Sequence, residues 1–320
     1  MRVGIVGCGL IGNKRAAALG DHPLVAVCDR DAGRARSLAA GHPGAAPVDL
    51  EELIARVDAV IVATTNDQLA PIARRAIDAG KHVLLEKPGA RSFAELEPLA
   101  ALAERRGVTV RVGYNHRFHP SALKAREILG AGGPPMFVRA RYGHGGRPGY
   151  DREWRADPAL SGGGELIDQG VHLIDLSRWF LGEEFADVRG RVVTAYWDMK
   201  VDDNAFLTLT TAQGRIAHLH ASCTEWKNLF SFEIYTRSAK LHLEGLGGSY
   251  GMERLHHHQM RPEMGPPDTV IHEFPLPDAS WALEWKDFIA ATGGARGLGA
   301  TLQDAREVLR VVGEAYQRCR

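Results

Sequence analysis

The first third of the chain alternates short apolar runs with longer segments of mixed character. Five apolar runs have the length of buried strands: residues 3–6, 25–28, 59–63, 82–85 and 108–112. Helices are predicted between them, because Asp49 and Ser92 each precede a glutamate by three residues in a capping box, while Gly80 and Gly107 are typical helix ends. Strands and helices that alternate in this way predict a doubly wound parallel sheet with helices on both faces.

Beyond Met136 apolar and polar residues alternate along strands that are joined by short turns. These predicted strands are residues 137–142, 188–196, 205–211, 215–222, 232–235 and 240–243. Helices are predicted at 121–129, 281–291 and 302–317. The pattern predicts an open, mostly antiparallel sheet with helices on one face and an apolar face left for a partner. We therefore expect an α/β protein with a first domain at residues 1–118 and an α+β domain at residues 119–320.

Composition argues against several classes of protein. The 39 lysines and arginines balance 39 aspartates and glutamates, so no net charge attracts nucleic acid or an anionic membrane. The four cysteines are scattered without a CxxC pair, which argues against a disulfide framework or a zinc site and favours a reducing cytoplasm. No apolar run approaches the roughly 18 residues that span a bilayer. A soluble, cytoplasmic protein of two domains is expected.

A glycine-rich turn follows the first predicted strand. The sequence GCGLIG places Gly7, Gly9 and Gly12 between this strand and a helix, where the backbone can approach a pyrophosphate and the helix N-terminus can bind it. Asp29 ends the next strand about 20 residues later, the spacing at which a carboxylate binds the adenosine ribose. The turn therefore predicts NAD as the cofactor. NADP stays an alternative, since Arg30 could accept its 2′-phosphate.

A carboxylate and an imidazole lie four residues apart in the glycine-rich stretch GGGELIDQGVHLID. In a helix, Asp168, His172 and Asp175 would form one polar stripe, with the leucines of the segment directed toward a core. Such a stripe is either the wet face of a capped helix or a proton-transfer site. Histidine suits the second role, because its ordinary pKa of about 6.5 allows proton exchange near neutral pH.

A lysine at the end of a predicted strand supplies a further partner for such a site. The apolar run 82–85 leads to Glu86-Lys87-Pro88, and ligands of open α/β sheets bind at the carboxyl ends of strands. An ammonium group at this place can stabilise an alkoxide that forms when a hydroxyl loses its proton, or polarise a ketone in the reverse reaction.

Five segments together resemble one family: GCGLIG, VDAVIVATTN, AGKHVLLEKP, GYNHRFHP and GGGELIDQGVHLIDLSRWFLG. They are similar to the glucose–fructose oxidoreductase/inositol dehydrogenase (Gfo/Idh/MocA) family over residues 1–182. The resemblance implies a Rossmann domain followed by an α/β domain with an open antiparallel sheet that is often used for oligomerisation. It also implies NAD(P)-dependent hydride transfer to or from a secondary alcohol or ketone of a sugar, sugar nucleotide or cyclitol. A homodimer or homotetramer is expected.

The resemblance also implies roles for particular residues. The catalytic set would be Lys87, Asp168 and His172, with His172 as general acid/base, Lys87 stabilising the oxygen and Asp168 orienting the imidazole or a sugar hydroxyl. The expected cofactor-binding residues are Gly7, Gly9, Leu10, Ile11, Gly12, Asp29, Arg30, Thr64, Thr65, Asn66, Glu86, Lys87 and Asn115. The expected substrate-binding residues are Arg117, Tyr150, Trp154, Arg155 and Tyr250. The family motif ATPNxxH reads ATTNDQL here, so Thr65 replaces its proline and Leu69 its histidine.

Two alternatives remain at this point. The run His256-His257-His258 suggests a metal site, but no acidic or cysteine cluster is near it in the sequence, and we predict an exposed loop without metal. A protein of the same fold could also act as a dinucleotide-binding sensor without turnover. The presence of all three candidate catalytic residues favours the enzyme.

Overall fold

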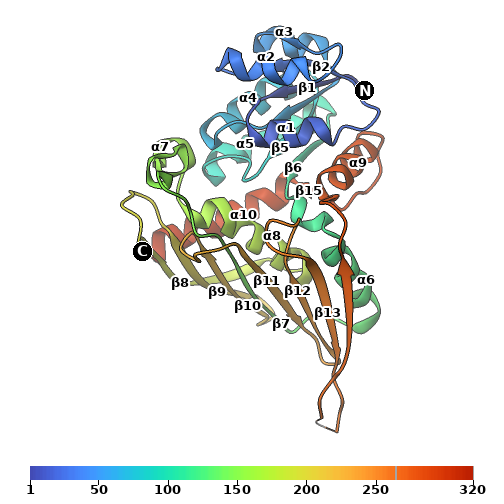
Figure 1. The fold of residues 1–320 in the computed structure, drawn as a ribbon, viewed down its shortest axis with the longest axis vertical. Coiled ribbons are helices and arrows are strands. Elements are labelled where there is room, and N and C mark those ends of the chain that lie inside the picture. The colour runs from blue at the N-terminus through green and yellow to red at the C-terminus, as the bar shows by residue number, and fades with distance from the viewer. Residues whose placement is uncertain (264, 320) are drawn as a thin grey trace. The chain divides into compact units, whose positions relative to one another are not determined.

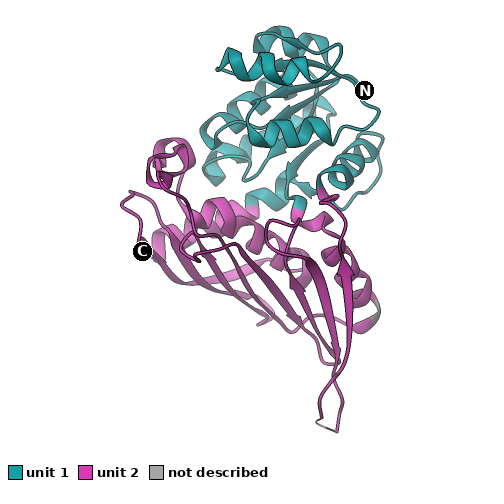
Figure 2. Ribbon diagram, viewed as in Figure 1, with its two compact units in different colours: residues 1–115, 281–306 teal, residues 116–280, 307–320 magenta. Residues whose placement is uncertain are grey.

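The computed structural model describes residues 1–263 and 265–319, which form two compact units (Figures 1 and 2). Unit 1 comprises residues 1–115 and 281–306, and unit 2 comprises residues 116–280 and 307–320. Among the described residues, no helix is both long enough and apolar enough to cross a membrane.

Unit 1 is built on a seven-stranded sheet with the strand order β15-β6-β5-β4-β1-β2-β3. Its strands are β1 (Val3–Val6), β2 (Leu24–Cys28), β3 (Ala46–Pro47), β4 (Ala59–Val62), β5 (His82–Glu86), β6 (Val110–Gly113) and β15 (Ala300–Thr301). All neighbours pair in parallel except β15, which is antiparallel to β6. The predicted parallel sheet is confirmed. The two strands that the sequence did not indicate, β3 and β15, have only two residues each.

Short-range signals mark the ends of several helices of unit 1. The helices are α1 (Leu10–Ala17), α2 (Ala32–Ala40), α3 (Leu50–Arg56), α4 (Asn66–Asp78), α5 (Phe93–Arg106) and α9 (Ser280–Thr292). The side chains of Asp49 and Ser92 accept hydrogen bonds from the third residue beyond, and Gly107 ends α5 in the left-handed conformation. Helix α2 was not predicted from the sequence. Its N-cap, Asp31, accepts hydrogen bonds from two backbone amides.

The core of unit 1 combines segments from both ends of the chain. Trp285 and Phe288 of α9 belong to the same buried cluster as Val3, Ile5 and other residues of the first strands. The indole of Trp285 donates to the Leu19 carbonyl oxygen at 3.1 Å. Helix α9 is therefore part of the first unit's fold, although it follows the whole of the second sheet in the sequence.

A buried arginine crosslinks unit 1. Arg15 of α1 is 1% exposed, and its guanidinium contacts Glu86 at 2.5 Å and Glu284 of α9 at 2.6 Å. It also lies 4.5 Å from the ring centre of Trp281. Burial would lower the pKa of Arg15, but the two carboxylates raise it above its ordinary value, so the group stays charged. One side chain thus joins α1, the end of β5 and α9.

Unit 2 is built on an eight-stranded sheet with the order β14-β13-β12-β11-β7-β10-β9-β8. Its strands are β7 (Phe137–Gly143), β8 (Phe185–Val193), β9 (Asn204–Thr211), β10 (Ile216–Ser222), β11 (Leu229–Tyr235), β12 (Ala239–Glu244), β13 (Glu253–Gln259) and β14 (Asp268–Phe274). Among the described strands of this sheet only β7 and β10 pair in parallel, so the predicted, mostly antiparallel sheet is confirmed.

Helices cover one face of this sheet. The helices that belong wholly or mostly to unit 2 are η1 (Asn115–Phe118), α6 (Pro120–Gly132), η2 (Tyr150–Arg152), η3 (Trp154–Ala156), α7 (Pro158–Ser161), η4 (Leu166–Gly170), α8 (Val171–Leu181) and α10 (Leu302–Arg318). Helix α8 packs on β7 and β10, while α6 packs on β12 and β13 (Figure 1). Inward positions alternate along the strands, as in the buried Val138, Ala140 and Tyr142 of β7.

The other face of the sheet is more polar than the predicted apolar face. Beside Phe137 and Ile216 it presents arginines, a lysine, glutamates and histidines, including Arg139, Glu233 and Lys240, which form an ion-paired group. Burial raises the pKa of the Glu233 carboxyl, but the hydrogen bonds and charges of Arg139 and Lys240 outweigh this effect and lower the pKa to about 2. Self-association through this unit stays a prediction.

The prediction of a loop at His256-His257-His258 is wrong. These residues lie in strand β13, which pairs with β12 and β14. Sequence reasoning missed both β13 and β14. In β13 the half-buried positions are polar, and in β14 the apolar Val270 and Ile271 are adjacent and exposed, so neither strand shows an apolar alternation.

We predict that Arg15→Met lowers the free energy of unfolding by about 3 kcal/mol or more, because it leaves two buried carboxylates without their shared cation. Arg56→Met is the matched control, since it removes an exposed i,i+4 pair with Glu52 in α3 and should cost less than about 0.5 kcal/mol. Urea unfolding curves of the two variants measure the difference. Equal losses would contradict a structural role for the buried triad.

Candidate active site

The glycine turn after β1 is shaped by contacts within the protein at two of its glycines. Gly7 has φ +94°, and a Cβ there would lie 2.3 Å from the Ala63 carbonyl oxygen. A Cβ on Gly12 would lie 2.0 Å from the carbonyl oxygen of Gly7. A Cβ on Gly9, in contrast, would meet nothing within 4 Å. Contacts within the protein therefore do not require glycine at residue 9, and the open space beside Gly9 fits a ligand that approaches the backbone.

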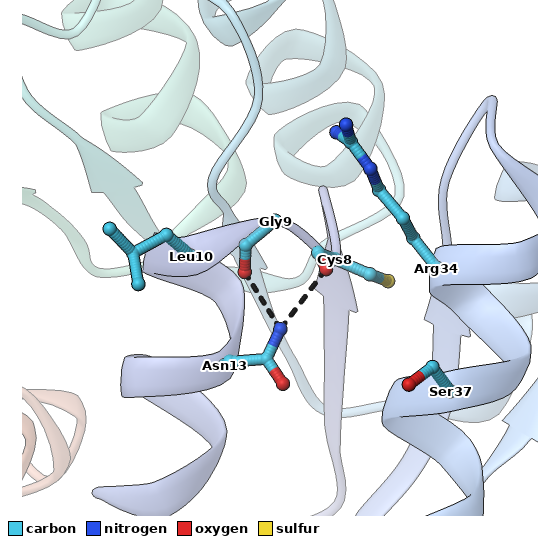
Figure 3. Close-up of a pocket in the computed structure, with 6 residues that line it drawn as sticks. All are labelled: Cys8, Gly9, Leu10, Asn13, Arg34 and Ser37. Atoms are coloured by element: carbon cyan, nitrogen blue, oxygen red, sulfur yellow. Dashed lines mark hydrogen bonds between the residues drawn. The ribbon is translucent and has the colours of Figure 1, made fainter. Parts of the chain in front are cut away.

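A hollow of about 410 Å3 opens beside this turn (Figure 3). Its lining residues are Cys8, Gly9, Leu10, Asn13, Arg34 and Ser37. The Asn13 side chain donates to the carbonyl oxygens of Cys8 and Gly9 at 3.1 and 2.8 Å, which fixes the turn against the first turn of α1. Arg34 and Ser37 come from α2 and were missed along with that helix.

Asp29 stands beside the same turn. Its carboxylate accepts hydrogen bonds from the backbone amides of Cys8 at 2.7 Å and Asp31 at 2.8 Å. These two bonds fix the half-buried carboxylate at the end of β2, between the glycine turn and the start of α2. Arg30, the next residue, is exposed.

The remaining predicted cofactor residues lie at or near the carboxyl ends of β4, β5 and β6. Thr64 and Thr65 follow β4, and the buried Asn66 begins α4. Leu69, which replaces the family's histidine, is fully buried in α4 and belongs to the hydrophobic core. The carboxylate of Glu86 is bound by Arg15, while Lys87 is half-buried and follows β5. Asn115 is buried at the start of η1.

In unit 2, the glycine-rich segment is held by a buried aspartate. Asp202 accepts from the backbone amides of Gly164 and Leu166 at 2.9 and 2.8 Å, and from the Tyr316 hydroxyl of α10 at 2.9 Å. A Cβ on Gly164 would lie 1.9 Å from the Asp202 carbonyl oxygen, and one on Gly163 would lie 2.1 Å from the Tyr316 hydroxyl. The glycines are therefore needed for this close approach, which fixes the start of the helical segment η4–α8.

Asp168 pairs with an arginine. Its carboxylate accepts from Arg155 Nε at 2.9 Å, and both side chains are partly exposed. The carboxylate is the largest cause that raises the pKa of Arg155, whose guanidinium also lies 4.7 Å from the ring centre of Trp154. Tyr150 is buried, and its hydroxyl donates to Glu165 at 3.4 Å. Unit 2 thus brings Asp168 together with Arg155 and Trp154, two of the predicted substrate residues.

His172 lies in a buried group of rings. Its imidazole is stacked on that of His116, with ring centres 3.8 Å apart, and faces the edge of Tyr142 at 6.1 Å. Tyr142 is hydrogen-bonded to Tyr250, and burial raises the pKa of Tyr142 and raises that of Tyr250 to about 12. Both phenols therefore keep their protons at neutral pH and can donate hydrogen bonds.

The predicted polar stripe of Asp168, His172 and Asp175 is largely buried in the structure. Asp175 is fully buried and accepts from Arg117 Nε at 2.8 Å, so this end of the stripe is an internal ion pair. The guanidinium of Arg117 is engaged in the same pair. The helix is not a wet face, because His172 and Asp175 are both buried. Lys87 belongs to unit 1 and Asp168 and His172 to unit 2, so their common action stays a prediction.

No group of three or more histidine, cysteine, aspartate or glutamate side chains among residues 1–263 and 265–319 is arranged to hold a metal. His256 and His258 lie on the open face of the sheet, where His256 stacks on His242 with ring centres 5.6 Å apart.

Two family models match the chain. Residues 1–114 match the model described as "Oxidoreductase family, NAD-binding Rossmann fold", and residues 122–242 match the "GFO/IDH/MocA C-terminal domain". The chain is 31% identical over 225 residues to UDP-N-acetylglucosamine 3-dehydrogenase of Acidithiobacillus ferrooxidans, covering 69% of this chain and 67% of that protein. The chain belongs to the Gfo/Idh/MocA family.

Other relatives share this assignment. The chain is 34% identical over 227 residues to inositol 2-dehydrogenase 2 of Saccharopolyspora erythraea, covering 67% of this chain and 64% of that protein. The match thus spans slightly less than two thirds of the length of this curated relative. The crystal structure of GenD2 from gentamicin A biosynthesis, in complex with NAD, is 26% identical with a TM-score of 0.84, and the match covers 99% of this chain and 93% of that chain.

Sequence reasoning missed two residues whose rings contact that of His172 in this Gfo/Idh/MocA protein, Tyr142 and His116. Tyr142 occupies an inward position in β7, so the alternation along this strand could have indicated it. His116 stands between Asn115 and Arg117, both of which were selected, and no local signal shows that its ring meets that of His172.

We predict that Gly164→Ala destabilises the protein by about 1–3 kcal/mol, because the methyl group must displace the backbone of Asp202. Gly313→Ala is the matched control. Gly313 lies within α10, and a Cβ there would meet nothing within 4 Å, so alanine should stabilise the protein by about 0.5–1 kcal/mol. Thermal or urea unfolding would disprove the steric argument if both alanines acted alike.

Proposed function

We propose that the protein is an NAD-dependent oxidoreductase that transfers hydride between the nicotinamide and a secondary alcohol or ketone of a sugar, sugar nucleotide or cyclitol. The observation that carries this proposal is the group formed by His172 and its ring neighbours beside the Asp168–Arg155 ion pair, in a chain with both family domains. The names of the relatives, an inositol dehydrogenase and a UDP-N-acetylglucosamine dehydrogenase, support a polyhydroxylated ring as substrate.

The glycine turn fits the proposed cofactor. The open space beside Gly9 and the amides at the N-terminus of α1 would hold the pyrophosphate, and Asp29 would accept from the ribose hydroxyls. Asp29 disfavours a 2′-phosphate by charge, which supports NAD over NADP. NAD supplies a hydride acceptor when it is bound.

His172 would take the proton of the reacting hydroxyl, since a neutral imidazole can accept it near neutral pH. Lys87 would stabilise the negative charge that develops on the same oxygen. Asp168 is engaged by Arg155, so we propose that the two side chains together bind a neighbouring hydroxyl rather than act on the reacting carbon. Because the Tyr142 and Tyr250 hydroxyls bond each other, one proton of the pair would remain to donate to a substrate with several oxygens.

We predict that NADH binds more tightly than NADPH and that Asp29→Ala reduces or reverses this preference, because the repulsion of the 2′-phosphate is removed. Fluorescence titration with each dinucleotide measures the ratio of dissociation constants. Asp31→Ala is the control, since Asp31 caps α2 and should leave the ratio unchanged. Asp29 would lose its proposed role if its alanine variant kept the wild-type ratio.

We predict that His172→Ala and Lys87→Ala each lower turnover by about 10²- to 10⁴-fold, the range for loss of a proton-transfer or charge-stabilising group. His172→Ala should leave NAD affinity nearly unchanged. Oxidation by the wild-type protein should rise with pH through the ionisation of His172, and this limb should disappear in His172→Ala. A panel of cyclitols, sugars and sugar nucleotides, followed by nicotinamide absorbance, provides the assay. Tight NAD binding without turnover of any of them would favour the sensor.

A further inference from the structure

His116 is the closest ring neighbour of the proposed proton acceptor. The two imidazoles are stacked with ring centres 3.8 Å apart and planes inclined by 20°. His116 is 6% exposed and His172 is 5% exposed, so the stack is removed from bulk water. His116 belongs to η1, whereas His172 belongs to α8, and the contact therefore depends on the folding of unit 2.

Three other rings fix the plane of His116. His119, Tyr142 and Phe230 meet it edge-on, with ring centres 5.5, 5.1 and 5.9 Å away and interplanar angles of 62–81°. Rings that surround an imidazole in this way restrict its rotation. His116 thus offers His172 a flat face in a fixed orientation.

A buried carboxylate stands behind this group. His119 Nδ1 lies 3.0 Å from Glu253 Oε2, and the Ser121 amide donates to Glu253 Oε1 at 2.8 Å. Burial raises the pKa of Glu253, but the bonds from His119 and Ser121 outweigh it and place the pKa below its ordinary value. The carboxylate is therefore ionised and paired with His119, whose ring meets the edge of the stacked histidine pair.

The geometry of the stack decides how His116 can act. An imidazole N–H lies in the plane of its ring, so two rings stacked face to face cannot pass a proton directly from nitrogen to nitrogen. The face of an aromatic ring, however, stabilises a cation placed over it. Burial disfavours the protonated form of a histidine, and a ring face at 3.8 Å offsets part of that cost.

We propose that His116 is a positioning residue for His172: its ring face supports the protonated form of the His172 imidazole and holds that ring in one orientation. The assignment of a role to this stack rests on the proposed function, in which His172 gains a proton during oxidation and gives one up during reduction. His116 itself neither accepts nor donates the proton that His172 exchanges with the substrate.

Other titratable and charged side chains of unit 2 also surround the stack. On the elements that carry or pack against the two rings they are Arg117, His119, Tyr142, Arg155, Glu165, Asp168, Asp175, Tyr250 and Glu253. A substitution at His116 alters none of these groups chemically, so a comparison of apolar and aromatic replacements tests the ring face.

The experiment is a histidine-selective NMR titration of the full chain with NAD bound, in which the His172 resonance is identified by its loss in His172→Ala. His116→Leu replaces the imidazole with an apolar side chain of similar volume and so removes the ring face. It should lower the His172 pKa by about half a unit to one unit. His116→Phe keeps a ring face and should leave this pKa unchanged or slightly raised. In an oxidation assay, the pH limb should shift in the same direction.

His220→Leu is the matched control, because His220 is stacked on Phe206 at 4.2 Å on the open face of the sheet, and its loss should not move the His172 resonance. The proposal is overturned if the leucine variant leaves the His172 pKa in place, or if phenylalanine lowers it as much as leucine does. If His116→Leu does not fold, a lowered pKa in His116→Phe is by itself the overturning result, and an unchanged one supports the ring face. The titration needs no substrate. Absence of turnover would therefore contradict the proposed function, while the His172 pKa in the His116 variants would still decide this inference.

Discussion

The buried guanidinium of Arg15 is the interaction on which unit 1 depends. A charge removed from water must be paired, and its two carboxylates come from residues 71 and 269 positions away in the sequence. Through Glu86 the arginine fixes the end of β5, directly before Lys87. Because Arg15 belongs to α1, the same ion pairs also fix this helix, whose N-terminal end adjoins the glycine turn and the hollow. The cofactor turn and the backbone of the candidate lysine are therefore built on one ion triad, and Glu284 adds α9 to it.

Asp202 has a corresponding place in unit 2. It occupies the amides at the start of the glycine-rich segment and the hydroxyl of Tyr316, so the orientation of the helix that carries Asp168 and His172 is determined by a buried carboxylate. The glycines of GGGELIDQG have a structural cause here, since a Cβ at Gly163 or Gly164 would overlap this anchor. In both units, a buried polar side chain fixes a helix beside candidate functional residues.

Much of this fold was predictable from local patterns. Caps at Asp49 and Ser92, the glycine turn and the strand alternation all act within a few residues, and the structure confirms them. Strands β13 and β14 were missed because apolar and polar residues do not alternate along them. Helix α2 was missed although its buried residues Ala35, Leu38 and Ala39 have helical spacing. The partners of Arg15, Asp168 and His172 could not be predicted either. Each of these contacts is made by tertiary packing, and a single sequence gives no signal for such a pairing.

The histidines show how burial and geometry, rather than local clustering, separate chemical roles. The run His256-His257-His258 has the stronger sequence signal, but a strand directs neighbouring side chains to opposite faces. The three imidazoles therefore do not all lie on one face. On the open face, His256 stacks on His242, while His258 is hydrogen-bonded to the Thr269 hydroxyl. His172 has no histidine near it in the sequence. It gains one when η1 packs beside α8, inside a group of rings where water is excluded and a single proton changes the local charge balance. A proton-transfer role is therefore better supported at the isolated histidine than at the conspicuous run.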